Sequence, residues 1–303
     1  MKEKHSIVFF SLVLSLSSTL FAQTTQTTLD YDDRVHPELA QNFMVVSQNH
    51  HSTDVGYLIL KQGGNAVDAA VAVGFSLAVT LPRAGNLGGG GFILIYSADS
   101  QEVSAIDYRS AAPAAATSEM FLTESGVVRF GHLVNAVPGS VAGLLKAHKK
   151  YGKLSLKEVL RPAIELASKG FPVPHDLNYV LNWAKGSMLD NSASRKKFYN
   201  SKDNPLPIAS IFTQPKLART LNLIANKGSE AFYEGEIADW IVKDSIANGG
   251  LITKQDLANY SAKDRVPIES FYRGYKIVSM SPVASGGIVL LQILNILENF
   301  NMT

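Results

Sequence analysis

The 303-residue chain carries 28 lysine and arginine residues against 26 aspartate and glutamate residues, a formal net charge of +2. Its apolar fraction of 46% can build a large core, which is typical of a globular protein. Because neither sign of charge forms a run, we expect no nucleic-acid or anionic-membrane partner. The chain has no cysteine, which excludes thiol chemistry, disulfides and any metal site built on cysteine.

The start of the chain differs in composition from the remainder. Lys2 and Lys4 precede an apolar stretch at residues 7–20, and Ala22 follows it. This order is typical of a secretory signal peptide, and the stretch is too short to span a bilayer. The alternative is a buried N-terminal helix, which the polar residues 23–28 disfavour. We therefore expect a periplasmic or secreted protein without a stable membrane span, with a signal peptide at residues 1–22 and a loose segment at residues 23–39.

From residue 40 onward, hydrophobic periodicity and capping residues predict alternating strands and helices. Three helices begin with a side-chain acceptor followed three residues later by a carboxylate: Asn65 with Asp68, Ser155 with Glu158, and Thr253 with Asp256. The predicted strands are residues 42–47, 92–96, 102–107 and 275–280, with a short hairpin about Ser125-Gly126. The predicted helices are residues 53–62, 66–80, 140–148, 156–169, 217–225, 235–248 and 288–299. This alternation favours a layered α/β or α+β architecture without a clear domain boundary.

Four glycines, residues 88–91, separate the predicted helix at 66–80 from the next predicted strand. A dinucleotide-binding loop needs its glycines after a strand and before a helix, and a phosphate-binding loop needs a lysine that is missing here. Two interpretations remain open. The glycines allow close packing against a neighbouring strand, or Gly88, Gly89 and Gly90 line a substrate pocket.

Arg109 follows the predicted strand at residues 102–107. A guanidinium at a strand end can hold a substrate carboxylate through two parallel hydrogen bonds, and it keeps its charge. The alternative is a surface arginine paired with Asp107. Ser285, followed by Gly286, precedes the last predicted helix and also has two interpretations. It presents its hydroxyl and the following amides to an anion, or it caps the helix.

Other catalytic or metal-binding patterns are missing from the sequence. It contains no Gly-x-Ser-x-Gly and no His-Glu-x-x-His motif. His50 and His51 are adjacent, and neighbouring residues on a strand point to opposite faces, so a shared metal ion is not expected. We expect neither a metal ion nor a cofactor.

Several sequence blocks between residues 40 and 300 occur in a characteristic order. The blocks are Gly63-Gly64-Asn65-Ala66-Val67-Asp68, Ala84-Gly85-Asn86-Leu87-Gly88-Gly89-Gly90-Gly91-Phe92, Asp107-Tyr108-Arg109, Val137-Pro138-Gly139-Ser140, Gly249-Gly250-Leu251-Ile252-Thr253 and Tyr272-Arg273-Gly274-Tyr275. Together they resemble the N-terminal, large-subunit portion of the γ-glutamyltransferase family, also called γ-glutamyltranspeptidases or glutathione hydrolases.

The resemblance implies an α+β N-terminal nucleophile hydrolase fold with four αββα layers, made as a precursor that cuts itself into two subunits. In that family the N-terminal threonine of the small subunit attacks the γ-glutamyl amide of glutathione, with its own amine as base. The acyl group then passes to water or to an amino acid. The family's arginine for the glutamyl α-carboxylate matches Arg109. One serine of the family's Pro-x-Ser-Ser-Gly-Gly pattern is replaced by Ala284.

The family's Thr-Thr-His-Tyr cleavage site and small subunit have no counterpart up to Thr303. We therefore expect residues 40–303 to form a truncated large-subunit part, with the second half of the fold absent and no activity of its own. The expected partners are glutathione or related γ-glutamyl compounds, and a second half from the same precursor or encoded separately. The competing hypothesis is a secreted, non-catalytic remnant that binds a partner or ligand without turnover.

Overall fold

The computed structural model describes residues 38–123 and 126–301. The chain divides into two compact units, residues 1–43 and 44–303. The described residues of the first unit, 38–43, form no helix or strand. The predicted signal peptide, most of the predicted loose segment, Ser125 and Thr303 lie outside the described residues.

Helix α3 (Ala66–Thr80) is the central helix of the core in the second unit. It packs against α2 (His50–Lys61), α4 (Ser140–Tyr151) and α5 (Leu156–Lys169). These contacts bury its apolar residues on several sides, as the almost continuous apolar sequence predicts. The three predicted capping boxes are all formed, and they begin α3, α5 and the short α12 (Lys254–Ala258).

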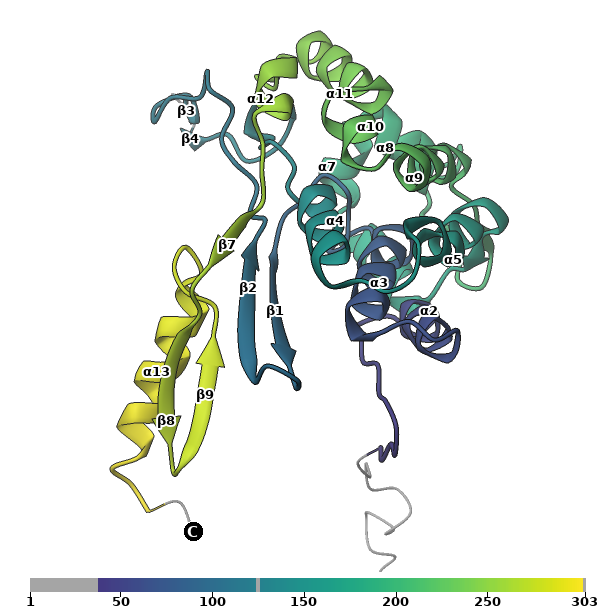
Figure 1. The fold of residues 1–303 in the computed structure, drawn as a ribbon. Helices are drawn as coiled ribbons and strands as arrows, with labels where there is room; N and C mark the ends of the chain where they lie inside the picture. Colours follow the sequence, from purple (N-terminus) through teal and green to yellow (C-terminus); the bar gives the residue numbers. More distant parts are fainter. Residues whose placement is uncertain (1–37, 124–125, 302–303) are drawn as a thin grey trace, which may run out of the picture. The chain divides into compact units, whose positions relative to one another are not determined.

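Further helices lie beside and above these four helices (Figure 1). They are α6 (His175–Trp183), α7 (Lys185–Leu189), α8 (Ser192–Phe198), α9 (Pro215–Lys227), α10 (Ser229–Tyr233), α11 (Glu236–Ala247) and the 3₁₀ helix η2 (His132–Val134). The chain also forms two short antiparallel strand pairs: β3 (Leu122–Thr123) with β4 (Gly126–Val127), and β5 (Phe171–Pro172) with β6 (Ile211–Phe212).

A three-stranded sheet carries the segment that contains Arg109. Its strand order is β1 (Phe92–Ser97), β2 (Glu102–Asp107) and β7 (Lys263–Arg265), with β2 in the middle. The β1–β2 hairpin matches the prediction, with Phe92 opposite Asp107 and Ser97 opposite Glu102. After β7 the chain forms the hairpin of β8 (Ile268–Tyr272) and β9 (Tyr275–Ser279), and α13 (Ser285–Leu297) lies against it (Figure 1).

All strand pairs among residues 38–123 and 126–301 are antiparallel, and helices and strands are mixed along the chain. This is the expected α+β class. The four-layer αββα arrangement stays a prediction.

Several predicted elements differ from the structure. Residues 44–47, the part of the first predicted strand that lies in this unit, pair with no strand in the described chain, so they form no strand. Apolar and β-branched residues favour a strand, but a strand also needs a partner. Helices α2 and α13 begin at His50 and Ser285, each three residues before its predicted start, and α4 ends at Tyr151, three residues beyond its predicted end.

Candidate functional site

Arg109 lies just beyond the end of β2, where its exposed side chain lines an open cavity of about 580 Å³. The wall of the cavity comes from the ends of β2 and β7, the loop after Arg109 and the region of α12. Its lining includes Asp107, Arg109, Ala114, Asp256, Tyr260 and Arg265.

The Asp107 carboxylate, in a residue that is 6% exposed, uses both of its oxygens. Its Oδ2 accepts hydrogen bonds from Nε and Nη2 of Arg265 at 3.0 and 2.9 Å, and its Oδ1 accepts one from the backbone N–H of Arg109 at 3.0 Å. The Asp107–Arg109 ion pair considered from the sequence is therefore not formed. The Arg109 guanidinium forms no ion pair with any residue that the structure describes.

Hydrogen bonds fix the backbone around Arg109 on several sides. The Tyr260 hydroxyl donates to the Arg109 carbonyl at 2.8 Å. On one side of Arg109, the Tyr108 N–H donates to Gly91 at 3.0 Å, and on the other, Ala111 and Val137 exchange two backbone hydrogen bonds of 3.1 and 2.8 Å. The arginine therefore projects from a well-anchored strand end, as a preorganised binding group requires.

The cavity holds two cationic groups, Arg109 and the exposed Lys263, that form no ion pair with any described residue. Burial, together with the nearby Asp107 and Tyr108, raises the pKa of Tyr260 to about 12, so its hydroxyl stays protonated at neutral pH. Burial works against the charged form of Asp256, but hydrogen bonds from Thr253 and from the Ala114 N–H outweigh this effect and lower its pKa. Such a cavity can bind a ligand carboxylate through two parallel hydrogen bonds from Arg109.

No sequence pattern indicated Tyr260, Lys263 or Arg265. Strand β7 is three residues long and reads Lys-Asp-Arg, so it lacks the apolar alternation by which a strand is found. The partner of Arg265 lies 158 residues away in the sequence, beyond the reach of any local pattern.

Gly90 and Gly91 pack against the Arg109 segment, and none of the four glycines is part of the cavity lining. A Cβ at Gly90 would lie 2.5 Å from the Ser110 nitrogen and 2.7 Å from the Tyr108 oxygen, whereas a Cβ at Gly88 would come no closer than 3.4 Å to any atom. The carbonyl of Gly89 accepts hydrogen bonds from two backbone N–H groups at the start of α4. This geometry is that of close packing, and a role of Gly88, Gly89 and Gly90 in binding substrate stays a prediction.

Ser285 is the first residue of α13, and Ala284 occupies the N-cap position without a capping side-chain hydrogen bond. The capping role considered for Ser285 is thus not observed. Ser285 and Gly286 are exposed and do not line the cavity, although Val283 does. An anion-binding role for Ser285 and Gly286 stays a prediction.

His50 and His51 begin α2 rather than following a strand. Their ring centroids are 3.8 Å apart, and His51 also contacts Phe171 edge-on. Burial and the neighbouring His50 lower the pKa of His51. Among residues 38–123 and 126–301, no group of three histidine or acidic side chains is arranged to hold a metal ion.

Comparisons with known proteins match most of the chain. A family model described as gamma-glutamyltranspeptidase matches residues 52–303. The "Glutathione hydrolase proenzyme" of Escherichia coli K12 is 48% identical over 276 residues, which cover 89% of this chain and 47% of the relative. The protein of the same description from Bacillus subtilis strain 168 is 36% identical over 299 residues, which cover 96% of this chain and 50% of the relative. The chain therefore spans about half the length of these curated relatives.

Solved structures agree with these relatives. The gamma-glutamyltranspeptidase of Helicobacter pylori matches with a TM-score of 0.85 and 42% identity, covering 88% of this chain and 78% of that one. The Pseudomonas nitroreducens gamma-glutamyltranspeptidase complexed with L-DON matches with a TM-score of 0.79 and 39% identity. The match covers 86% of this chain and 77% of that one.

Proposed function

Because the chain belongs to the gamma-glutamyltranspeptidase family, we propose that it forms the part of a γ-glutamyl-transferring enzyme that holds the α-carboxylate of the substrate. The substrates are glutathione and related γ-glutamyl amides, in keeping with the description of the relatives as glutathione hydrolases. One observation carries the proposal. The Arg109 guanidinium faces a cavity without an ion-pair partner among the described residues, even though a carboxylate lies two residues away.

In this proposal Arg109 binds and orients the glutamyl group, and a second polypeptide segment supplies the nucleophile. The hydroxyl oxygen of an N-terminal threonine adds to the γ-carbonyl carbon, and its proton passes to the threonine's own amine. The C–N bond then breaks, the leaving amine takes that proton, and a glutamyl ester remains on the threonine. Water or an amino acid attacks the ester, releases the glutamyl group and restores the hydroxyl.

The exposed face of α13 supports a second half as the partner. Its apolar side chains, which share a high exposure of 41 to 60%, are Ile288, Val289, Leu290, Ile293 and Ile296. A contiguous apolar surface of this kind marks an interaction site. The second half comes from the same precursor or is encoded separately.

We also infer that the chain is exported, because residues 1–22 have the composition of a signal peptide. No helix in the described ranges, 38–123 and 126–301, is long and apolar enough to cross a membrane. Mass spectrometry of the protein from a periplasmic fraction checks export. We expect a new N-terminus after Ala22, and a full-length cytoplasmic protein would contradict it.

The test of the proposed function compares the chain alone with an assembled complex. The complex contains the chain and the portion of the E. coli relative that the chain does not cover. We expect release of a chromogenic amine from a γ-glutamyl donor by the complex and none by the chain alone. Turnover by the chain alone would show that the nucleophile lies within it. A stable complex that binds the donor without turnover would favour the non-catalytic remnant. Sequencing the DNA beyond codon 303 shows whether Thr-Thr-His-Tyr is encoded there.

A further inference from the structure

Three charged side chains gather at one end of the three-stranded sheet. Asp107 and Arg109 are two residues apart, and side chains with this spacing on an extended chain point to the same side. In the β2–β7 register Lys263 lies opposite Asp107 and Arg265 lies opposite Ala105, so Arg265 is the diagonal neighbour of Asp107. Asp107, Arg109 and Arg265 all line the same cavity.

Two arginines are therefore within reach of one buried carboxylate, and Arg265 is the one that binds it. Its Nε and Nη2 both donate to Oδ2 of Asp107, at 3.0 and 2.9 Å. The other oxygen, Oδ1, accepts the backbone N–H of Arg109, which holds the Arg109 backbone without using the guanidinium. Both carboxylate oxygens are occupied, and the Arg109 side chain is left without an anion among the described residues.

A buried carboxylate that loses its cation must find another, because an unpaired buried charge is costly. Without Arg265, the cations closest in the sheet register and sequence are Arg109 and Lys263. We propose that Arg265 is a positioning residue, which occupies the buried Asp107 carboxylate and thereby keeps the Arg109 guanidinium free for an anionic ligand. The identity of this ligand as the glutamyl α-carboxylate rests on the proposed function. The competition between Arg265 and Arg109 for the Asp107 carboxylate does not depend on it.

The test measures how fast phenylglyoxal modifies Arg109 in the full chain, by peptide mass spectrometry. Phenylglyoxal attacks the neutral guanidine, so a paired carboxylate slows it. Labelling of Arg129, which is also exposed and forms no ion pair with a residue that the structure describes, serves as the internal reference. We expect R265Q to slow labelling of Arg109 by roughly two- to five-fold, the range of a partly exposed ion pair. R265K, which keeps a positive charge beside Asp107, should slow Arg109 labelling less than R265Q does.

The double variant D107N/R265Q separates this role from a merely structural one. The amide oxygen that D107N introduces can still accept the Arg109 N–H, but the side chain carries no charge. Arg265 is then no longer needed, and Arg109 labelling should return to the wild-type rate. Unchanged labelling in a folded R265Q variant would overturn the proposal, and so would slow labelling that D107N does not rescue. If R265Q fails to fold, the double variant still decides, because the proposal requires it to fold and to label normally.

The outcome is independent of turnover. In the assembled complex R265Q should raise KM for a γ-glutamyl donor more than it lowers kcat, and D107N should reverse this rise. If R265Q slows Arg109 labelling and D107N restores it, but the complex has no γ-glutamyl activity, the positioning role of Arg265 stands and the proposed function is refuted. If activity depends on Arg109 but R265Q leaves Arg109 labelling unchanged, the proposed function stands and the positioning role of Arg265 is refuted.

Discussion

The Tyr260 hydroxyl donates a hydrogen bond of 2.8 Å to the carbonyl oxygen of Arg109, from 151 residues further along the chain. Gly139 makes room for this contact, since a Cβ there would overlap both the Tyr260 hydroxyl and the Tyr108 carbonyl. Arg109 therefore depends on a residue that follows α12, and the long-range contact fixes the strand end from which the guanidinium projects.

The Y260F variant should change how stability depends on alkaline pH. Burial, then Asp107 and Tyr108, raises the Tyr260 pKa from 10.0 to about 12, so between these values the unfolded chain has lost a proton that the folded chain keeps. Stability from this group is thus present below pH 10 and lost as the pH rises toward 12. We expect the free energy of unfolding, measured with urea between about pH 9 and 12, to fall less steeply with pH in Y260F than in the wild-type protein. The difference in slope should correspond to about one proton. The same dependence of unfolding free energy on pH in the two proteins would contradict the raised pKa of Tyr260.

Gly90→Ala and Gly88→Ala form a matched pair. The new methyl group at position 90 would meet the backbone of Tyr108 and Ser110 at 2.7 and 2.5 Å, and the Arg109 segment must move to admit it. We expect G90A to cost about 1–3 kcal/mol in free energy of unfolding, and G88A to stay within about 0.5 kcal/mol. Thermal unfolding of both variants checks this. Similar losses in the two variants would show that the packing beneath Arg109 is not the cause.

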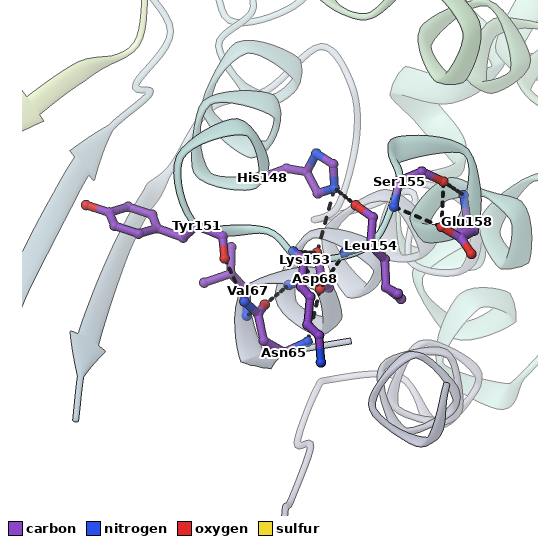
Figure 2. Close-up of polar contacts among 9 residues, drawn as sticks. All are labelled: Asn65, Val67, Asp68, His148, Tyr151, Lys153, Leu154, Ser155 and Glu158. Atoms are coloured by element: carbon purple, nitrogen blue, oxygen red, sulfur yellow. Dashed lines mark hydrogen bonds and ion pairs between the residues drawn. The ribbon is translucent and has the colours of Figure 1, made fainter. Parts of the chain in front are cut away.

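Asp68 joins two parts of the core that are far apart in the sequence (Figure 2). Its side chain is fully buried and accepts backbone N–H groups from Asn65 at 3.0 Å, Lys153 at 3.0 Å and Leu154 at 3.2 Å. The same carboxylate thus completes the capping box of α3 and holds the turn between α4 and α5. His148 lies beside it and donates to the Leu154 carbonyl at 2.9 Å.

We expect D68N to lower the free energy of unfolding by about 2–4 kcal/mol, because an amide NH₂ would face backbone donors and leave them unsatisfied. The control is Ser155→Ala, which removes an exposed capping box at the start of α5 and should cost about 1 kcal/mol. Urea denaturation measures both. If D68N lowers the free energy of unfolding no more than S155A does, Asp68 stabilises the protein only by capping α3, and its contacts with Lys153 and Leu154 add nothing.

Local signals predicted the parts of the fold that depend on neighbouring residues. The capping box that begins α5 needs only Ser155 and Glu158, three positions apart, so the sequence shows it directly. The β1–β2 hairpin is likewise local. Residues 44–47 have a strand-like sequence, but strand pairing depends on another segment, and none in the described chain pairs with them.

The candidate site could be predicted only in part for the same reason. Arg109 could be singled out because it follows a recognisable strand and matches a family block. What frees its guanidinium is the contact of Arg265 with Asp107 across 158 residues, which no spacing rule reveals. Tyr260 was missed for the same reason, as its partner lies across the sheet end rather than nearby in the sequence.

The central claim, that Arg109 binds the α-carboxylate of a γ-glutamyl substrate, is tested most directly by one cycle of measurements. The assembled complex and its Arg109→Gln variant are each assayed for kcat/KM with γ-glutamyl p-nitroanilide and with 4-aminobutyryl p-nitroanilide, which lacks only the α-carboxylate. We expect the wild-type complex to prefer the γ-glutamyl compound by about 10²-fold, equivalent to about 2.7 kcal/mol, and R109Q to lose most of that preference. An R109Q complex that keeps the full preference would contradict the assignment of Arg109.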